Sequence, residues 1–233
     1  MKIIILAAGM GTRLNNNIPK CLTKLHTGET ILDRQLNSLL DFVDKKDITI
    51  VVGYKSELIK KQYTNYSFVD NPYYKDTNTA KSLLYALDNF FSDSDVIWLN
   101  ADVVFDSTIL KPLFKINQSS MLVDQSVVGD EEVKYTLNDD GSIQQVSKVI
   151  KNGLGEAIGI NKIINSHLDK FISNLKKCSD DDYFENAIEL LINENVKIYP
   201  INIDKSFCYE IDTQDDLNFV NKYLKENENK SKN

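Results

Sequence analysis

A short glycine-containing segment near the start of the chain combines backbone freedom with positive charge. The residues from Leu6 to Leu14 read L-A-A-G-M-G-T-R-L, and Pro19 and Lys20 follow shortly afterwards. Glycines let backbone N–H groups approach phosphate oxygens closely, while Arg13 and Lys20 add positive charge in the same loop. In a chain with a net charge of −7, this local group of cations predicts a triphosphate site.

Two common phosphate-binding motifs do not match this segment. A dinucleotide-binding fingerprint needs a third glycine where Leu14 stands, and a Walker A loop would end in Gly-Lys-Ser/Thr. Two glycines alone are more typical of a tight strand-to-helix turn that binds no ligand. Because Arg13, Pro19 and Lys20 accompany the glycines, we favour the phosphate-binding interpretation.

The elements that must position this loop alternate between strand and helix in the first half of the chain. Short apolar segments predict four strands, and apolar stripes at helical spacing lie between them. The strands are expected at residues 2–7, 47–53, 66–70 and 95–100, and the helices at 32–43, 56–63 and 80–91. This alternation predicts a parallel sheet with helices on both faces, and such sheets bind ligands at the carboxyl ends of their strands.

The second half of the chain predicts a mixed-strand extension of this sheet. Shorter strands and a hairpin turn are expected at 120–125, 133–137, 138–141, 143–150 and 156–160. Two helices, a late strand and a capped final helix are expected at 168–175, 184–191, 196–201 and from 213 onwards. The chain is therefore predicted to be α/β, with one domain over residues 1–226 and a disordered polar tail at 227–233.

Composition narrows the classes of function. The 233 residues carry 27 basic and 34 acidic side chains, which argues against a protein that coats nucleic acid or a membrane surface. No apolar run approaches the roughly 20 residues of a membrane span. The three cysteines have neither zinc-site spacing nor a disulfide framework, so we expect a reducing, cytoplasmic location, without nucleic acid or membrane as a partner.

The glycine segment and several later segments occur in the order known from one enzyme family. Residues 6–14 with Pro19-Lys20 resemble the nucleotidyltransferases that join a nucleoside monophosphate to a small phosphorylated acceptor, such as sugar-nucleotide pyrophosphorylases and bacterial choline-phosphate cytidylyltransferases. The resemblance covers nearly the whole chain and continues at residues 31–36, 52–54, 77–83, 100–102 and 209–213. It implies a Rossmann-like, doubly wound mixed sheet of the nucleotide-diphospho-sugar transferase (GT-A-like) kind, with a nucleotide-binding half to about residue 115 and an acceptor-binding half at about 116–226.

The resemblance narrows further in the second half. Residues 181–186 and 210–212 look most like cytidylyltransferases that act on phosphocholine, 2-aminoethylphosphonate or L-glutamine phosphate, and no hexapeptide repeat is present. It implies transfer of CMP from CTP with release of pyrophosphate, for capsule, cell-surface polysaccharide or lipid modification. A hexose-1-phosphate nucleotidyltransferase using UTP or dTTP is the alternative enzyme, and a non-catalytic nucleotide-binding regulator is the alternative outside enzymes. The oligomeric state, monomer or dimer, stays open.

The family pattern assigns roles to four charged residues. Arg13 would bind the β- and γ-phosphates, and Lys20 would bridge the α-phosphate and the incoming acceptor oxygen. Asp102 and Asp212 match the acids that hold Mg²⁺ on the nucleotide, and carboxylate oxygens suit this ion. Either aspartate could instead be a helix cap or a loop carboxylate, and Asp212 is more open to this alternative because Thr213 can cap the next helix.

The resemblance also implies contacts to the two substrates. The nucleotide would lie against two short segments and the end of a strand, through Leu6, Ala7, Ala8, Gly9, Gly11, Thr12, Asn78, Thr79, Ala80, Ser82, Asn100 and Ala101. An ordinary helix start explains the segment from 78 to 82 about equally well. The acceptor would be bound by Lys148, Tyr183, Glu185, Tyr209 and Glu210, whose rings and carboxylates suit an ammonium group. Phe184 is better explained as a core residue, and the single Trp98 disfavours a full aromatic cage and thus a trimethylammonium acceptor.

Overall fold

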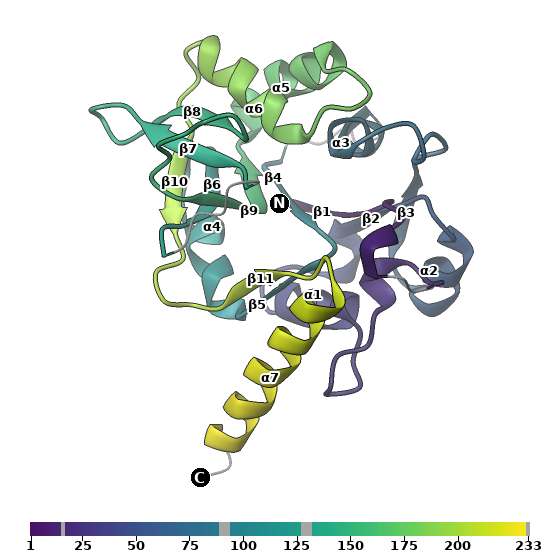
Figure 1. Ribbon diagram of the computed structural model, residues 1–233. Coiled ribbons are helices and arrows are strands. Elements are labelled where there is room, and N and C mark those ends of the chain that lie inside the picture. The colour runs from purple at the N-terminus through teal and green to yellow at the C-terminus, as the bar shows by residue number, and fades with distance from the viewer. Residues whose placement is uncertain (15–16, 89–93, 127–131, 232–233) are drawn as a thin grey trace.

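The computed structural model describes residues 1–14, 17–88, 94–126 and 132–231, and a mixed β-sheet forms its centre (Figure 1). Four strands run parallel in the order β3-β2-β1-β4 and have the bounds Lys2–Ala7 (β1), Ile48–Val52 (β2), Ser67–Asp70 (β3) and Val96–Asn100 (β4). These are the four strands expected from the apolar segments. All except β3 at the edge are buried along most of their length, which explains why they stand out in the sequence as continuous apolar segments.

The sheet continues on the other side of β4 with antiparallel pairing. β9 lies between β4 and β6 and is antiparallel to both, whereas β10 is parallel to β6, and a β7–β8 hairpin joins β9. The bounds are Ser120–Asp124 (β6), Lys134–Leu137 (β7), Ile143–Ser147 (β8), Glu156–Ile163 (β9) and Tyr199–Asn202 (β10). The predicted mixed, doubly wound α/β fold is therefore confirmed.

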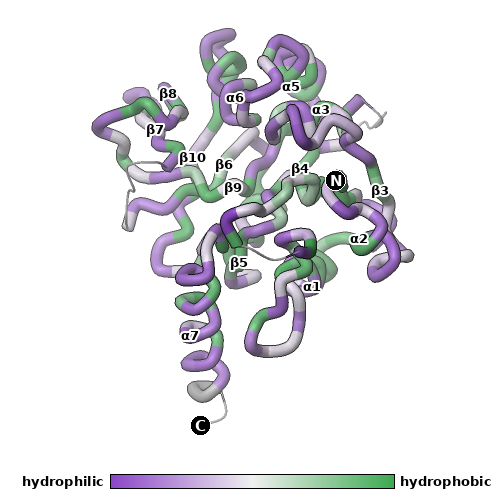
Figure 2. The backbone as a smooth tube through the Cα atoms, turned by 45° about the vertical axis from the view of Figure 1, so that its right-hand side comes forward, coloured by the Kyte–Doolittle hydropathy of each residue, from purple (hydrophilic) through white to green (hydrophobic). Residues whose placement is uncertain are grey.

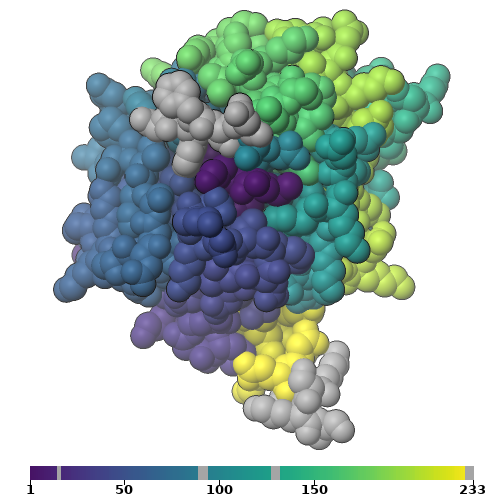
Figure 3. Space-filling view, turned by 180° about the vertical axis from the view of Figure 1, so that it is seen from behind, coloured from purple at the N-terminus to yellow at the C-terminus, as the bar shows by residue number. Residues whose placement is uncertain are grey.

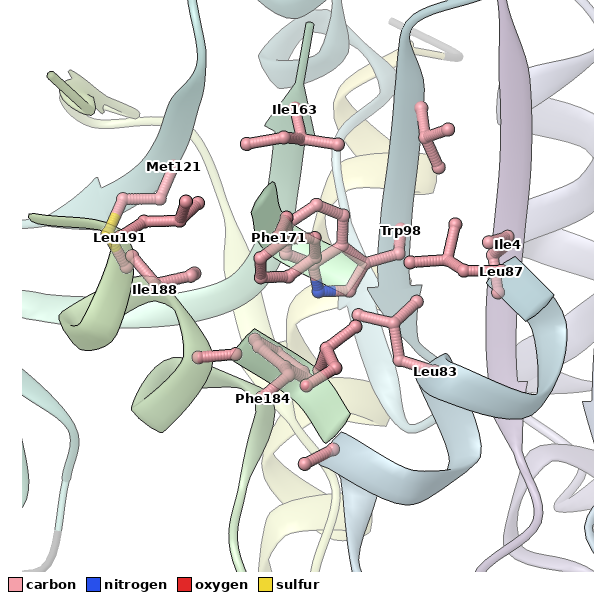
Figure 4. Packing of buried hydrophobic residues seen from close by; sticks show 14 of the residues in the cluster. Ile4, Leu83, Leu87, Trp98, Met121, Ile163, Phe171, Phe184, Ile188 and Leu191 are labelled. Atoms are coloured by element: carbon pink, nitrogen blue, oxygen red, sulfur yellow. The ribbon is translucent and has the colours of Figure 1, made fainter. Parts of the chain in front are cut away.

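Helices cover both faces of the sheet, as strand alternation requires. On one face, Trp98 of β4 stacks on Phe171 of α5 at 5.0 Å between ring centroids and meets Phe184 of α6 edge-on at 5.7 Å (Figure 4). Ile3 and Ile5 of β1 point to the opposite face, into the second apolar cluster. The helices of the first face are Thr79–Asp88 (α3), Asn165–Lys177 (α5) and Phe184–Asn193 (α6), and those of the second are Ile31–Leu39 (α1), Ser56–Gln62 (α2) and Lys111–Lys115 (α4).

The strand order creates a switch point between β1 and β4. The chain moves from β1 through β2 to β3 on one side, then returns to place β4 on the other side of β1. Seen from behind, the purple amino end of the chain reaches the surface (Figure 3), so β1 delivers its carboxyl end and the following loop to the opposite side. Ligands of open α/β sheets bind at such a point.

A second, two-stranded sheet lies outside the sequence prediction. Val103–Phe105 (β5) pairs antiparallel with Cys208–Glu210 (β11), and the final helix Gln214–Ser231 (α7) packs beside them on Leu14, Ile31 and Val104. Three-residue strands show too few alternations to be recognised in the sequence. The short helix α4 was also not predicted.

Residues 227–231 of the expected disordered tail are described as helix, and residues 232–233 of that tail lie outside the described residues. Helix α7 continues through Ser231 and extends away from the sheet, with polar and apolar stretches alternating along it (Figure 2). The buried apolar side chains of this helix end at Leu224, but the helical backbone continues beyond it. The imidazole of His26 lies 3.6 Å from a carboxylate oxygen of Glu228 in this last part. Within the described part of the chain, no helix is both long enough and apolar enough to cross a membrane.

Candidate active site

The loop after β1 is shaped so that Lys20 lies directly against it. Gly11 has a φ of +57°, and a Cβ at this position would lie 2.9 Å from the Cβ of Lys20. A side chain there would therefore be strained by its conformation and would push Lys20 away. Around Gly9 a Cβ would meet nothing within 4 Å, so the loop is open at that point. Thr12 lies exposed in the following turn.

The four charged residues singled out in the sequence meet at this loop. The Nζ of Lys20 donates to Asp102 at 2.8 Å and to Asp212, and the guanidinium of Arg13 contacts the other Asp212 oxygen at 2.8 Å. The Lys20 side chain is only 13% exposed, whereas that of Arg13 is 68% exposed. Burial lowers the pKa of Lys20, but the charges and hydrogen bonds of Asp102 and Asp212 outweigh it and raise the pKa, so this lysine is charged.

A third carboxylate joins the two predicted aspartates. Oxygens of Asp102, Glu210 and Asp212 lie within 4.8 Å of one another. The negative charge of Asp102, followed by desolvation and the charge of Asp212, raises the pKa of Glu210 to about 8. We predicted Glu210 as an acceptor contact, and the structure brings it into this acidic cluster, because β11 runs beside β5 and places residues 210–212 next to Asp102.

The acidic cluster fits a hard divalent cation. The Oδ1 of Asp102 is buried and has no hydrogen-bond partner among the described residues, while its Oδ2 binds Lys20. An orphaned carboxylate oxygen in such a position is unfavourable unless a cation or water completes it. Oxygen-only donors of this kind suit Mg²⁺, which usually takes one or two protein carboxylates and completes its shell with phosphates and water.

The backbone of the predicted nucleotide segment lies at the switch point. Ala8 is buried at the end of β1, and its carbonyl accepts from the N–H of Tyr54 at 3.0 Å. Ala101 donates its N–H to the carbonyl of Leu6 at 3.1 Å, which joins the ends of β1 and β4. Ala7 is in β1 and also buried, so these residues form the floor of the site through their backbone. Asn100 completes β4 beside Leu6.

The segment from Asn78 to Ser82 already has other hydrogen-bond partners. The N–H of Asn78 donates to Asp180 O at 2.7 Å, and the N–H of Ala80 donates to Asp182 O at 3.2 Å. The hydroxyl of Thr79 accepts from the N–H of Phe184 at 3.1 Å. The hydroxyl of Ser82 accepts from the side chain of Asn71 at 2.9 Å and is buried, so this segment is primarily tied to the start of α6 and to β3.

Three of the predicted acceptor residues come together at the start of α6. The ammonium of Lys148 lies 4.4 Å from the ring centroid of Tyr183, whose side chain stands at the helix start and is 43% exposed. Glu185 is 8% exposed, and its Oε2 has no hydrogen-bond partner among the described residues. Burial raises the pKa of Glu185 to about 7, and the positive charge of Lys148 acts in the opposite direction.

The side chains of two other aromatic residues, Tyr209 and Phe184, do not join this group. Tyr209 packs on α7, with its ring centroid 4.7 Å from that of Phe219 and its hydroxyl donating to Asp216 at 3.4 Å. Neighbouring residues of a strand point to opposite sides, so Tyr209 and Glu210 separate, and the structure does not join Tyr209 to Tyr183. Phe184 is fully buried against Trp98, which confirms its interpretation as a core residue.

The match to a known domain covers the half of the chain that carries the loop and Asp102. The model of the MobA-like NTP transferase domain matches residues 3–131, more than half of the chain. The chain belongs to the MobA-like NTP transferase family. It therefore carries a nucleotidyltransferase domain, as the resemblance of its glycine segment predicted.

Individual relatives cover the remainder as well. The bifunctional protein GlmU of Francisella philomiragia is 26% identical over 211 residues, which cover 85% of this chain and 46% of GlmU. The choline-phosphate cytidylyltransferase of Streptococcus pneumoniae is 28% identical over 246 residues, covering 98% of this chain and 100% of the relative. The solved CTP:phosphocholine cytidylyltransferase LicC from Streptococcus pneumoniae shares the fold, with a TM-score of 0.81, 24% identity, and coverage of 96% and 98% of the two chains. This chain spans about half the length of the GlmU proteins that it matches.

Proposed function

We propose that this nucleotidyltransferase is a Mg²⁺-dependent cytidylyltransferase, which transfers CMP from CTP to a small amine-bearing phosphate or phosphonate and releases pyrophosphate. The observation that carries this proposal is the meeting of Arg13 and Lys20 with the carboxylates of Asp102, Glu210 and Asp212 at the switch point. The two cations suit the negative phosphates, and the carboxylates suit the metal ion bound to them. The site also lies at the switch point, where α/β sheets bind their ligands.

The reaction requires positioning and charge neutralisation more than proton transfer. An anionic oxygen of the acceptor attacks the α-phosphorus of CTP in line, the new P–O bond forms, and the bond to the β-phosphate oxygen breaks as pyrophosphate leaves. Because the nucleophile is already an anion, no general base is needed. Lys20 is held as a cation and would stabilise the charge around the α-phosphate, while the exposed Arg13 would bind the outer phosphates.

The ion pairs among these residues are expected to exchange partners when substrates bind. Asp212 now binds both Arg13 and Lys20. The triphosphate would take over the two cations and leave the oxygens of Asp102 and Asp212 to hold Mg²⁺. The bound ion would neutralise charge on the phosphates. Binding of the triphosphate would therefore free carboxylates for Mg²⁺, and the bound Mg²⁺ would in turn favour binding of the triphosphate.

The start of α6 supports an acceptor with an amine. Tyr183 is partly exposed with the ammonium of Lys148 over its ring, and the carboxylate of Glu185 lies close enough to Lys148 for their charges to interact. An ammonium group gains from both a ring face and a carboxylate, while Lys148 suits the phosphate, phosphonate or carboxylate of the same acceptor. Phosphocholine, 2-aminoethylphosphonate and L-glutamine phosphate have this chemistry. Their CMP derivatives would be made in the cytoplasm and would serve the modification of cell-surface polysaccharide or lipid.

A second candidate acceptor class is supported by the GlmU relatives. A hexose-1-phosphate nucleotidyltransferase using UTP or dTTP would use the same loop and the same acidic cluster. The two candidates differ at the start of α6, since an ammonium group would gain both charge attraction to Glu185 and a cation–π contact, whereas a sugar hydroxyl would gain only a hydrogen bond to the carboxylate.

A matrix of substrates tests the proposal. Pyrophosphate release is measured for CTP, UTP, dTTP, ATP and GTP, each with phosphocholine, phosphoethanolamine, 2-aminoethylphosphonate, L-glutamine phosphate and glucose-1-phosphate. We expect turnover with CTP and at least one amine-bearing acceptor. Turnover confined to UTP or dTTP with the sugar phosphate would establish the alternative, and binding of CTP without turnover of any acceptor would favour a nucleotide-binding regulator.

A further inference from the structure

A buried glutamine holds the backbone of the turn that carries Asp102. Gln35 lies in α1 and is only 1% exposed. Its Nε2 donates to the carbonyl of Asn100 at 2.8 Å and to the carbonyl of Val103 at 2.8 Å, which lie on either side of Asp102. Both protons of this amide are therefore committed to a single turn between β4 and β5.

Backbone bonds join the same turn to the other parts of the site. The N–H of Ala101 donates to Leu6 O at 3.1 Å at the end of β1, and the N–H of Ile211 donates to Asp102 O at 3.0 Å. The turn thus connects the strand before the phosphate loop to the segment with Glu210 and Asp212. The bonds of Gln35 to the carbonyls of Asn100 and Val103 come from its side chain, so a substitution at position 35 removes them without changing the backbone.

Core stability alone does not account for an amide at this position. The Oε1 of Gln35 is buried without a hydrogen-bond partner among the described residues, which is unfavourable. The neighbouring core positions of α1 are Leu32, Leu36 and Leu39, and an apolar residue at position 35 would pack with them without an orphaned oxygen. Such a residue would, however, leave the carbonyls of Asn100 and Val103 without the donors that Gln35 provides. The choice of glutamine is explained by the turn that it holds.

We propose that Gln35 is a positioning residue for the metal–triphosphate site, a role that rests on the function proposed above. By fixing the turn from Asn100 to Val103, it keeps a carboxylate oxygen of Asp102 near those of Glu210 and Asp212. A turn free to shift would separate these oxygens and weaken their joint affinity for a divalent cation. Outer residues that orient metal ligands commonly contribute in this way.

The test compares Gln35→Met with the wild-type protein. Methionine has a similar length and flexibility but donates no hydrogen bond. Binding of Mn²⁺ in the presence of α,β-methylene-CTP is followed by electron paramagnetic resonance, and pyrophosphate release is measured across Mg²⁺ concentrations. We expect Mn²⁺ to bind about 10-fold more weakly and the half-saturating Mg²⁺ concentration to rise by a similar factor. At saturating metal, kcat and the KM for the acceptor are expected to be close to wild type.

Leu39→Ala is the matched control, because Leu39 is a fully buried residue one turn further along the same helix. This variant lowers the melting temperature through a cavity but leaves the bonds of Gln35 in place. Metal affinity should therefore stay at the wild-type value. Equal weakening in Leu39→Ala and Gln35→Met would overturn the proposal, since general loosening of α1 would explain it.

Further outcomes are equally decisive. Wild-type Mn²⁺ affinity in Gln35→Met would contradict the positioning role while leaving the proposed function intact. If Gln35→Met does not fold, the shorter Gln35→Asn takes its place with the same expectation, and failure of both to fold while Leu39→Ala folds would establish a purely structural role. Absence of metal binding and of CMP transfer in the wild-type protein would overturn both proposals.

Discussion

The loop region after β1 and the region at the start of α6 are built in different ways. In the first region, the cations and carboxylates satisfy one another through short ion pairs between Lys20, Asp102 and Asp212. In the second region, Lys148 lies over the ring of Tyr183, and the Oε2 of Glu185 is buried without a partner among the described residues. In the first region the two cations are therefore already paired before a substrate binds, and one buried oxygen of Asp102 has no partner among the described residues. In the second region the buried oxygen of Glu185 would be satisfied by a cation or a proton.

This contrast teaches which steps each region can control. The paired cations and carboxylates of the first region would bind the triphosphate and the metal ion. Substitutions there should therefore change kcat and the metal requirement most strongly. A half-exposed aromatic ring and a desolvated carboxylate should affect acceptor affinity and its pH dependence instead. Variants in the two regions are expected to separate into these two classes.

The largest expected effect is that of Lys20→Ala. Removal of this buried cation takes away stabilisation that grows at the α-phosphate, and kcat should fall by about 10²–10³-fold. Steady-state pyrophosphate release with CTP and the best acceptor measures it. Lys24→Ala, an exposed lysine of the same segment, is the control and should keep wild-type kcat. A Lys20→Ala enzyme with kcat near the wild-type value would show that both regions act only in binding.

Asp102→Asn is expected to change the metal requirement. The amide weakens the acidic cluster, so the half-saturating Mg²⁺ concentration should rise by at least the about 10-fold typical of lost metal-site support. EDTA should abolish transfer in the wild-type enzyme, and added Mg²⁺ should restore it. Asp139→Asn, in an exposed hairpin turn, serves as the control. Full activity in chelated enzyme would rule out the assignment of the acidic cluster to a metal.

The region at the start of α6 predicts a pH dependence. Burial raises the pKa of Glu185 to about 7, so its carboxyl group is largely neutral at pH 6 and ionised at pH 8. The KM for an amine-bearing acceptor should therefore decrease severalfold between these values, and Glu185→Gln should remove most of that change. Initial rates at varied acceptor and fixed, saturating CTP measure it. A wild-type pH profile in Glu185→Gln would contradict the role of this carboxylate.

The same pKa predicts how stability changes with pH. Glu185 has a folded-state pKa of about 7, above the ordinary 4.5, so the folded state binds more protons than the unfolded state between these two values. Its contribution to the free energy of unfolding is fully present below pH 4.5 and is lost as pH rises to about 7. Urea unfolding at pH 5 and pH 8 should show a smaller loss for Glu185→Gln than for the wild type. An equal loss would place the titration elsewhere.

The smallest expected effect is that of Tyr183→Ala. A partly exposed ring contributes about 0.5–1 kcal/mol to a cation, so the KM for the acceptor should rise by about two- to fivefold with little change in kcat. Tyr183→Phe keeps the ring and should behave like the wild type. Tyr73→Ala removes an exposed ring elsewhere and is the control. A loss of kcat comparable to that of Lys20→Ala would remove the distinction between the two regions.

Local patterns in the sequence were sufficient for the central fold. Buried strands such as β1 and β4 are continuous apolar runs, and their ends identified both the loop with Lys20 and the position of Asp102. The three-residue strands β5 and β11 were missed, because their pairing joins residues about 100 positions apart and leaves almost no periodic signal. That pairing is what brings Glu210 into the acidic cluster.

The structure brings together the charged residues that the sequence singled out, whereas packing decides the surroundings of the other predicted site residues. Charge pointed to Lys20 and the aspartates, whereas Tyr209 turned out to pack on α7 because of its register in β11. Hydroxyl and amide residues such as Thr79 have many possible partners, and the structure gives it the N–H of Phe184. The hydrogen bonds of Gln35 depend on a crossing of α1 and β4 that no local pattern reveals.

The most direct test of the central claim is a ³¹P NMR time course of the enzyme with CTP, Mg²⁺ and an amine-bearing acceptor. The account predicts that pyrophosphate and a new diphosphate diester appear together in equal amounts, and that both signals are nearly absent with Lys20→Ala. Release of inorganic phosphate instead of pyrophosphate, or an unchanged time course for Lys20→Ala, would contradict it.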